Sequence, residues 1–115
     1  ALLELGTDNQ TRLVGAPVSG PLFEFAPAID QFLKVHLFGD IFARDNLDWA
    51  TRELATVGAL AAMPGLAPQL ESHLKISMNV GLTAQQLNQV ASELKHRGDQ
   101  DAAERIVSAL DKIRD

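Results

Sequence analysis

The segment from Trp49 to Ala62, WATRELATVGALAA, limits the fold of this chain more than any other part of the sequence. Its residues favour a helix, and apolar side chains occur around most of the helix circumference. Such a helix is expected at the centre of a bundle or of an oligomer, because an apolar side left on the surface would face water. Asp48 is a suitable N-cap in front of the segment, and Met63-Pro64-Gly65 ends it.

The rest of the chain also favours helices over strands. The sequence has 16 Ala and 17 Leu against seven Val and five Ile, and it contains no strand-like alternation. Apolar spacing and capping residues predict a first helix that begins at Pro27 and is broken at Gly39. They predict further helices from Trp49 to Ala62, from Leu66 to Val80, from the Thr83/Gln86 capping box to Gly98, and from the Asp99 cap to Ile113. We therefore expect an all-α fold of five to six helices in a single domain over residues 1–115. Its centre would be an antiparallel helix hairpin.

The N-terminal residues have a different character. Glycine, proline, asparagine and serine are frequent over residues 6–21, and this composition is typical of loops. We expect residues 1–21 to form an arm or loop.

Charge and cysteine content exclude several classes of function. The formal charge is −5 and the pI is near 5.0, whereas a nucleic-acid binder needs a basic face. No stretch of about 18 apolar residues is present, so no membrane span is expected. Cysteine is absent, which excludes disulfides, cysteine-ligated metals and thiol catalysis. A cytoplasmic location is expected, or a periplasmic or exported one if a signal segment preceded Ala1.

Two polar residues stand out in the predicted hairpin. Glu53 lies 11 residues before Pro64 and His73 lies nine after it. At 1.5 Å rise per residue, the two are within about 3 Å of the same height on antiparallel helices. A buried carboxylate needs a partner, and a Glu–His pair would orient an imidazole for proton transfer. The same pair could instead only hold two helices together.

The other candidate residues are more ambiguous. His36 follows an apolar face and could line a core or a pocket, whereas His96 near a helix C-terminus is a structural candidate. Arg44 and Arg52 flank the start of the apolar helix, where either could bind a substrate carboxylate or pair with a nearby aspartate. The three histidines are not clustered, so no metal site is expected.

Several stretches together resemble the carboxymuconolactone decarboxylase family. They are Leu37 to Arg44, Leu47-Asp48, Thr51 to Thr56, Ala59 to Ala62, Gln69 to His73 and Asn79 to Thr83. The resemblance covers about residues 22–97. It implies an AhpD-like helical bundle that assembles as a homo-oligomer, a trimer or hexamer.

The resemblance points to two chemistries. One branch removes CO₂ from γ-carboxymuconolactone in aromatic catabolism, with neither metal nor organic cofactor. The alkylhydroperoxidase branch uses Glu…Cys-x-x-Cys-x-x-x-His, and Glu53 and His73 match its carboxylate and histidine. Its two cysteines would align with Leu66 and Gln69, or with Gly65 and Pro68, so the peroxidase mechanism is disfavoured.

The leading hypothesis from the resemblance is a cofactor-independent lyase that acts on a small carboxylated lactone or related acid. His73 would transfer the proton, and Glu53 would orient the His73 imidazole. The residues expected to bind the substrate are Arg52, Arg44, His36, Phe38, Phe42 and Trp49. The chain differs from the decarboxylases in one turn, where Arg44-Asp45-Asn46-Leu47 replaces Arg-Pro-Gly-Leu. The resemblance therefore does not specify the identity of the substrate. The alternative is a non-catalytic, oligomeric, ligand-binding member of the family.

Overall fold

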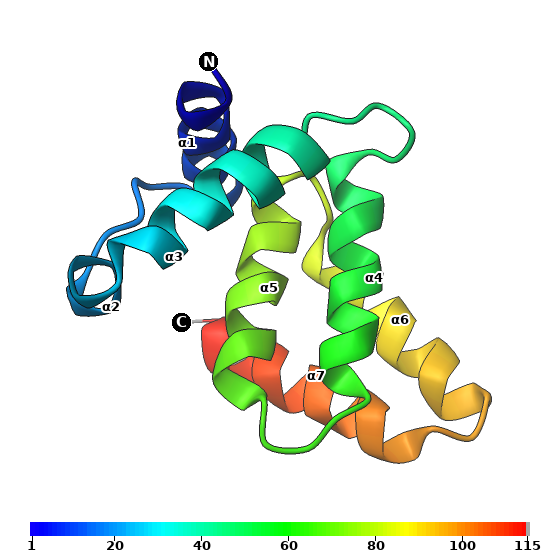
Figure 1. Cartoon of the computed structure of the whole chain (residues 1–115). Coiled ribbons are helices and arrows are strands. Elements are labelled where there is room, and N and C mark those ends of the chain that lie inside the picture. The colour runs from blue at the N-terminus through cyan, green and yellow to red at the C-terminus, as the bar shows by residue number, and fades with distance from the viewer. Residues whose placement is uncertain (115) are drawn as a thin grey trace. The chain divides into compact units, whose positions relative to one another are not determined.

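The computed structural model describes residues 1–114, and the described chain is entirely helical outside its turns (Figure 1). The helices are α1 (Leu2–Val14), α2 (Pro21–Phe25), α3 (Pro27–Phe32), the π-helix η1 (Leu33–Ile41), α4 (Trp49–Ala61), α5 (Ala67–Asn79), α6 (Ala84–His96) and α7 (Gln100–Ile113). This architecture confirms the all-α prediction. Contacts divide the chain into an N-terminal unit, Ala1–Asp48, and a C-terminal unit that begins at Trp49.

The N-terminal unit contains a helix where a loop was expected. Residues 2–14 form α1, so the expected arm or loop over residues 1–21 is wrong for this part. Two of the residues that predicted a loop, Gly6 and Asn9, instead contact η1. An added Cβ at Gly6 would lie 1.4 Å from the Lys34 carbonyl oxygen, and the Asn9 side chain donates to the Phe38 carbonyl at 2.8 Å. Tertiary packing of this kind overrides low helix propensity.

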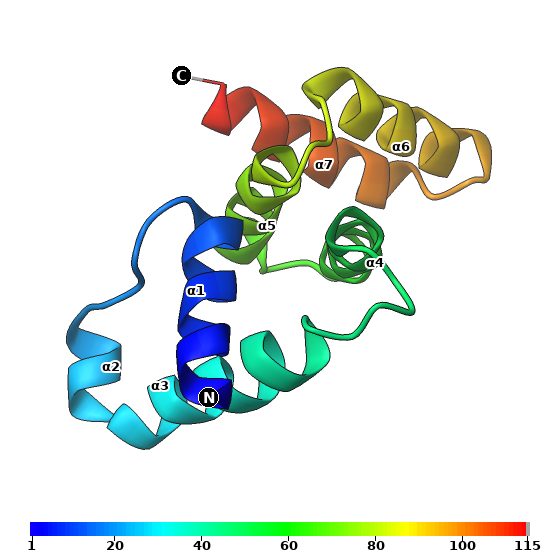
Figure 2. The ribbon, with the colours of Figure 1, turned by 90° about the horizontal axis from the view of Figure 1, so that it is seen from above.

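The helix that begins at Pro27 continues further than the sequence indicated. Gly39 was expected to break it, but Gly39 is buried inside the π-helix, which ends at Ile41. The wider winding is evident where the Phe42 N–H donates to the Leu37 carbonyl, five residues back. Gly39 serves close packing here, since an added Cβ would lie 2.6 Å from the Leu2 carbonyl oxygen. Figure 2 shows α1 lying against this segment.

The C-terminal unit is built around the predicted hairpin. Helices α4 and α5 are antiparallel neighbours, joined by the turn that holds Pro64 and Gly65 (Figure 1). Gly65 has a φ of 85°, which glycine adopts without strain. Helix α7 packs against α4 and α5, and α6 runs beside α7 (Figure 2). The hairpin therefore holds its polar residues on two supported helices.

Buried side chains from all four helices form the core of this unit. They include Val57 and Ala61 of α4, Leu70 and Leu74 of α5, Leu87 and Ala91 of α6, and Ala102, Ala103, Ile106, Ala109 and Leu110 of α7. Val107 of the same helix is exposed. Small residues at three of these α7 positions let the helix approach its neighbours closely.

Most helix ends follow their predicted signals. Thr83 and Gln86 form the capping box at the start of α6, and the Asp99 side chain accepts from the Ala102 N–H at the start of α7. Gly81 and Gly98 adopt positive φ after α5 and α6. None of the helices in the described chain is long and apolar enough to cross a membrane.

Candidate functional site

Glu53 and His73 meet inside the C-terminal unit. The His73 Nδ1 lies 2.7 Å from the Glu53 Oε2, across the α4–α5 hairpin. The Glu53 side chain is only 2% exposed, whereas the His73 side chain is 33% exposed. The contact predicted from sequence spacing is therefore confirmed. The carboxylate end of the pair is therefore shielded from solvent, whereas the imidazole end is partly exposed to it.

Helical periodicity explains why the carboxylate is buried. Glu53 is followed at intervals of four residues by Val57 and Ala61, and all three lie on the buried face of α4. Removing a charged carboxylate from water costs several kcal/mol unless it is paired. The imidazole across the hairpin supplies that partner.

His73 is held by its own helix as well. Leu70, Leu74 and Ser77 are buried around it on α5, and the Ser77 hydroxyl donates to the His73 carbonyl at 2.7 Å. The backbone that carries the imidazole is thus fixed by packing on either side.

The contact determines which ring nitrogen is available for chemistry. An ionised carboxylate only accepts hydrogen bonds, so Nδ1 is the donor to Glu53. Nε2 is then the nitrogen available to a ligand. A distance of 2.7 Å is typical of a charge-assisted hydrogen bond. This arrangement can hold a proton and deliver it.

Two other predicted site residues lie on α4. Trp49 precedes Glu53 by four residues, so the two side chains leave the same side of the helix. Arg52 directly precedes Glu53 and is turned by about 100° from it. Both side chains are half-buried. Trp49 is therefore the better oriented of the two toward the pair.

The remaining predicted residues belong to the N-terminal unit. His36 and Arg44 both lie near the Asp40 carboxylate, at 3.8 Å and 3.5 Å. The Phe38 and Phe42 rings pack against each other with centroids 5.5 Å apart. The aspartate pairing considered for Arg44 is thus present, and a joint site of these four residues with Glu53 and His73 stays a prediction.

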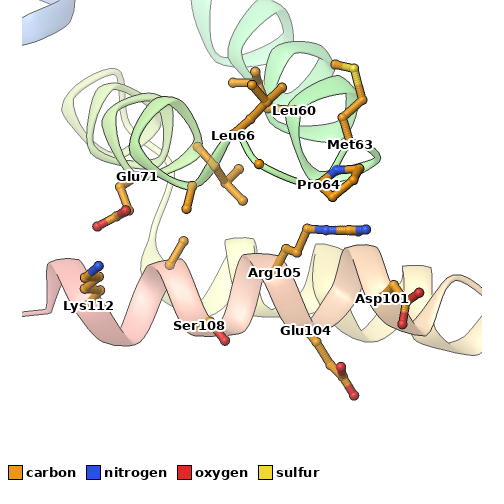
Figure 3. A pocket seen from close by; sticks show the side chains of 14 residues that line it. Leu60, Met63, Pro64, Leu66, Glu71, Asp101, Glu104, Arg105, Ser108 and Lys112 are labelled. Carbon is orange, nitrogen blue, oxygen red and sulfur yellow. The ribbon is translucent and has the colours of Figure 1, made fainter.

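The structure also shows a cavity that sequence reasoning missed. A cavity of about 520 Å³ lies between α7 and the turn joining α4 to α5, and Arg105 and Lys112 are among its lining residues (Figure 3). We call it the α7 cavity. Neither Glu53 nor His73 lines it. Residues from three helices form it, so no single stretch of the sequence indicates it.

Metal ligands are not concentrated anywhere in the part of the chain that the structure describes. Among residues 1–114, no group of three or more histidine and acidic side chains is placed to hold a metal ion.

These features define an all-helical protein with a buried carboxylate–imidazole pair and no thiol. The family model for the carboxymuconolactone decarboxylase family matches residues 27–112, and the chain belongs to that family. The matched region begins at α3 and includes both residues of the pair. Because the chain has no cysteine, this member lacks the Cys-x-x-Cys motif. The comparison with curated proteins gives no match.

Proposed function

We propose that this chain is a cofactor-independent carboxy-lyase or related acid–base enzyme that acts on a small carboxylated lactone or similar acid. The supporting observation is the 2.7 Å contact between a buried Glu53 and a partly exposed His73. A buried carboxylate that holds a solvent-accessible imidazole is suited to proton transfer to a bound molecule.

In the proposed reaction, the bond between the substrate carbon and its carboxylate breaks and CO₂ leaves. The electron pair of that bond remains on the lactone as an enolate. His73 donates a proton from Nε2 to the enolate carbon, and Glu53 stabilises the imidazolium before the transfer. A fixed cation near the enolate would lower the barrier further.

Arginine is the residue that we propose for substrate binding. The planar guanidinium of Arg52 or Arg44 would hold a substrate carboxylate through two parallel hydrogen bonds. Trp49, which leaves α4 on the same side as Glu53, would cover the apolar part of the substrate. His36, Phe38 and Phe42 would complete the pocket.

A non-catalytic role is the second candidate. The pair lines neither the α7 cavity nor a second cavity of about 450 Å³ that lies between α6 and α7. This observation favours a Glu53–His73 contact that holds α4 to α5. The chain would then be an oligomeric ligand-binding member of the family. Peroxidase activity of the AhpD type is disfavoured, because a dithiol mechanism needs cysteines.

Turnover by the full chain distinguishes these candidates. Purified protein is mixed with γ-carboxymuconolactone and with related lactone and open-chain acids, and released CO₂ is measured. The proposal expects saturable CO₂ release from at least one acid, and a raised KM in Arg52→Gln or Arg44→Gln. Binding of an acid, seen as a raised melting temperature, without CO₂ release would support the non-catalytic candidate instead.

A further inference from the structure

Asn9 is a buried polar residue in the middle of α1, with only 5% of its surface exposed. Asparagine is a poor residue for a helix interior, because its side chain competes with the backbone for hydrogen bonds. A buried side-chain amide also needs a hydrogen-bond partner. Here the Asn9 Nδ2 donates to the Phe38 carbonyl of η1 at 2.8 Å. The Asn9 side chain therefore acts on the backbone of another helix and not on its own.

The Phe38 carbonyl is the acceptor that an ordinary α-helix would offer to Phe42. In α-winding, the Phe42 N–H would donate to the carbonyl four residues back in the chain. In this structure it donates instead to the Leu37 carbonyl at 2.9 Å, five residues back. A carbonyl that loses its donor costs free energy. Asn9 supplies the donor that the Phe38 carbonyl loses in the wider turn, so its hydrogen bond favours π-winding over α-winding.

The backbone of α1 lies against the same π-helix. An added Cβ at Gly6 would lie 1.4 Å from the Lys34 carbonyl oxygen and 2.9 Å from the Gly39 nitrogen. Lys34 and Gly39 are five residues apart, which is the spacing of a π-helical hydrogen bond. Two separate contacts of α1, through Gly6 and through Asn9, thus fall on backbone atoms whose positions depend on the winding of η1.

The winding of this last turn determines where the following side chains point. Successive side chains on an α-helix are turned by about 100° from each other. A change from a five-residue to a four-residue turn takes one residue out of it, so the side chains beyond the turn rotate by about that angle. Phe42 follows η1 directly and packs against Phe38, with ring centroids 5.5 Å apart. Arg44 lies two residues further on, and all three residues are expected to bind the substrate.

We propose that Asn9 is a positioning residue, which holds the last turn of η1 in π-winding and so directs Phe42 and Arg44 toward a carboxylate substrate. Without the Asn9 side chain, the Phe42 N–H moves to the Phe38 carbonyl and the turn becomes α-helical, which is the commoner winding. The part of this proposal that concerns the substrate rests on the proposed function, whereas the part that concerns the winding does not.

Nuclear magnetic resonance tests the winding directly. In protein labelled with ¹⁵N and ¹³C, the scalar coupling across a hydrogen bond identifies the carbonyl that accepts from the Phe42 N–H. The expected acceptor is Leu37 in the wild type and Phe38 in Asn9→Ala. Thr7→Ala is the matched control and should keep Leu37 as the acceptor, because the Thr7 hydroxyl donates to a carbonyl of α1 itself at 2.7 Å. A coupling to Leu37 that persists in Asn9→Ala would overturn the proposal.

Hydrogen exchange separates the role of the Asn9 hydrogen bond from the docking of α1. In Asn9→Ala, exchange of the α1 amides should stay within about two-fold of the wild type, because the close contacts of Gly6 and Gly39 remain. Gly6→Ala, which places a Cβ on the backbone of η1, is the reference for α1 that has left its place. Exchange in Asn9→Ala as fast as in Gly6→Ala would contradict a specific role of Asn9, since loss of α1 would then explain any change in winding.

Kinetics test the role of Asn9 in positioning. For an acid from which the wild type releases CO₂, Asn9→Ala should raise KM by about five-fold or more and change kcat by less than about two-fold, because Phe42 and Arg44 bind the substrate and transfer no proton. An unchanged KM in a variant whose acceptor has moved to Phe38 would overturn the positioning role. A wild type that converts no acid would refute the proposed function and with it the substrate role of Asn9, whereas the resonance result on the winding would stand.

Discussion

Glu53 and His73 show how a single contact can serve either stability or chemistry. Glu53 is almost fully buried, so the free energy of its burial depends on the imidazole partner. A salt bridge of this kind adds little net stability compared with well-packed apolar residues. At the residue scale, two effects of replacing His73 have to be separated. One is the loss of stability when Glu53 has no partner, and the other is the loss of a proton donor.

Stability provides the first prediction at this scale. His73→Ala leaves a buried acceptor without its donor, so the free energy of unfolding should fall by about 1–3 kcal/mol. Urea denaturation followed by circular dichroism measures it. His96→Ala, at the exposed end of α6, is the matched control and should change the value by less than about 0.5 kcal/mol. Equal effects of the two substitutions would show that the pair contributes nothing to stability.

At the scale of helices, local sequence signals determine where some helices begin, whereas other helices depend on tertiary contacts. The capping box of Thr83 and Gln86 and the Asp99 cap act within one turn, so the sequence alone predicted the starts of α6 and α7. Helix α1 depends on Gly6 meeting the backbone of η1, almost thirty residues later in the chain. No local pattern predicts such a contact, so the glycines in this segment indicate a loop when the sequence is considered alone.

The contact between α1 and η1 gives the second prediction. Gly6→Ala places a Cβ on the Lys34 carbonyl, and backbone cannot move aside cheaply, so α1 should leave its place on η1. Hydrogen exchange of the α1 amides should rise by at least ten-fold. Gly58→Ala within α4 is the control, since nothing lies within 4 Å of its added Cβ, and it should stabilise the helix by about 0.5–1 kcal/mol. Unchanged exchange in Gly6→Ala would mean that α1 does not pack on η1.

The α6 cap gives the third prediction. Thr83→Ala removes the side chain that accepts from the Gln86 N–H at 3.0 Å. The free energy of unfolding should fall by about 1 kcal/mol. Thr56→Ala, within α4, provides a comparison for the intrinsic difference between the two residue types, since the Thr56 hydroxyl donates only to the Arg52 carbonyl of its own helix at 3.0 Å. A loss no larger in Thr83→Ala than in Thr56→Ala would argue against the capping box.

At the scale of the whole molecule, the missing thiol distinguishes this chain from the alkylhydroperoxidase branch. Spacing along the sequence was enough to place Glu53 against His73, because the hairpin geometry is regular. It could not reveal the α7 cavity, whose lining comes from α4, α5, α7 and a turn. Likewise, the resemblance implies substrate-binding residues in both units, but it does not define how these residues contact a substrate.

Peroxide chemistry gives the fourth prediction. Because the chain has no cysteine, it should consume no organic hydroperoxide with dithiol reductants above the rate of a protein-free control. Peroxide loss followed by absorbance measures the rate. Turnover that is retained in His73→Gln would point to a contaminant, whereas turnover that is lost in that variant would contradict the assignment of this chain to thiol-free chemistry.

The central claim is that the Glu53–His73 pair transfers a proton during decarboxylation. The most direct test is kcat/KM for CO₂ release, per folded molecule, in the wild type, His73→Gln and Glu53→Gln. The account predicts a fall of about 10²–10⁴-fold in His73→Gln and a smaller fall in Glu53→Gln, with both variants still folded. Undiminished CO₂ release by folded His73→Gln would contradict it.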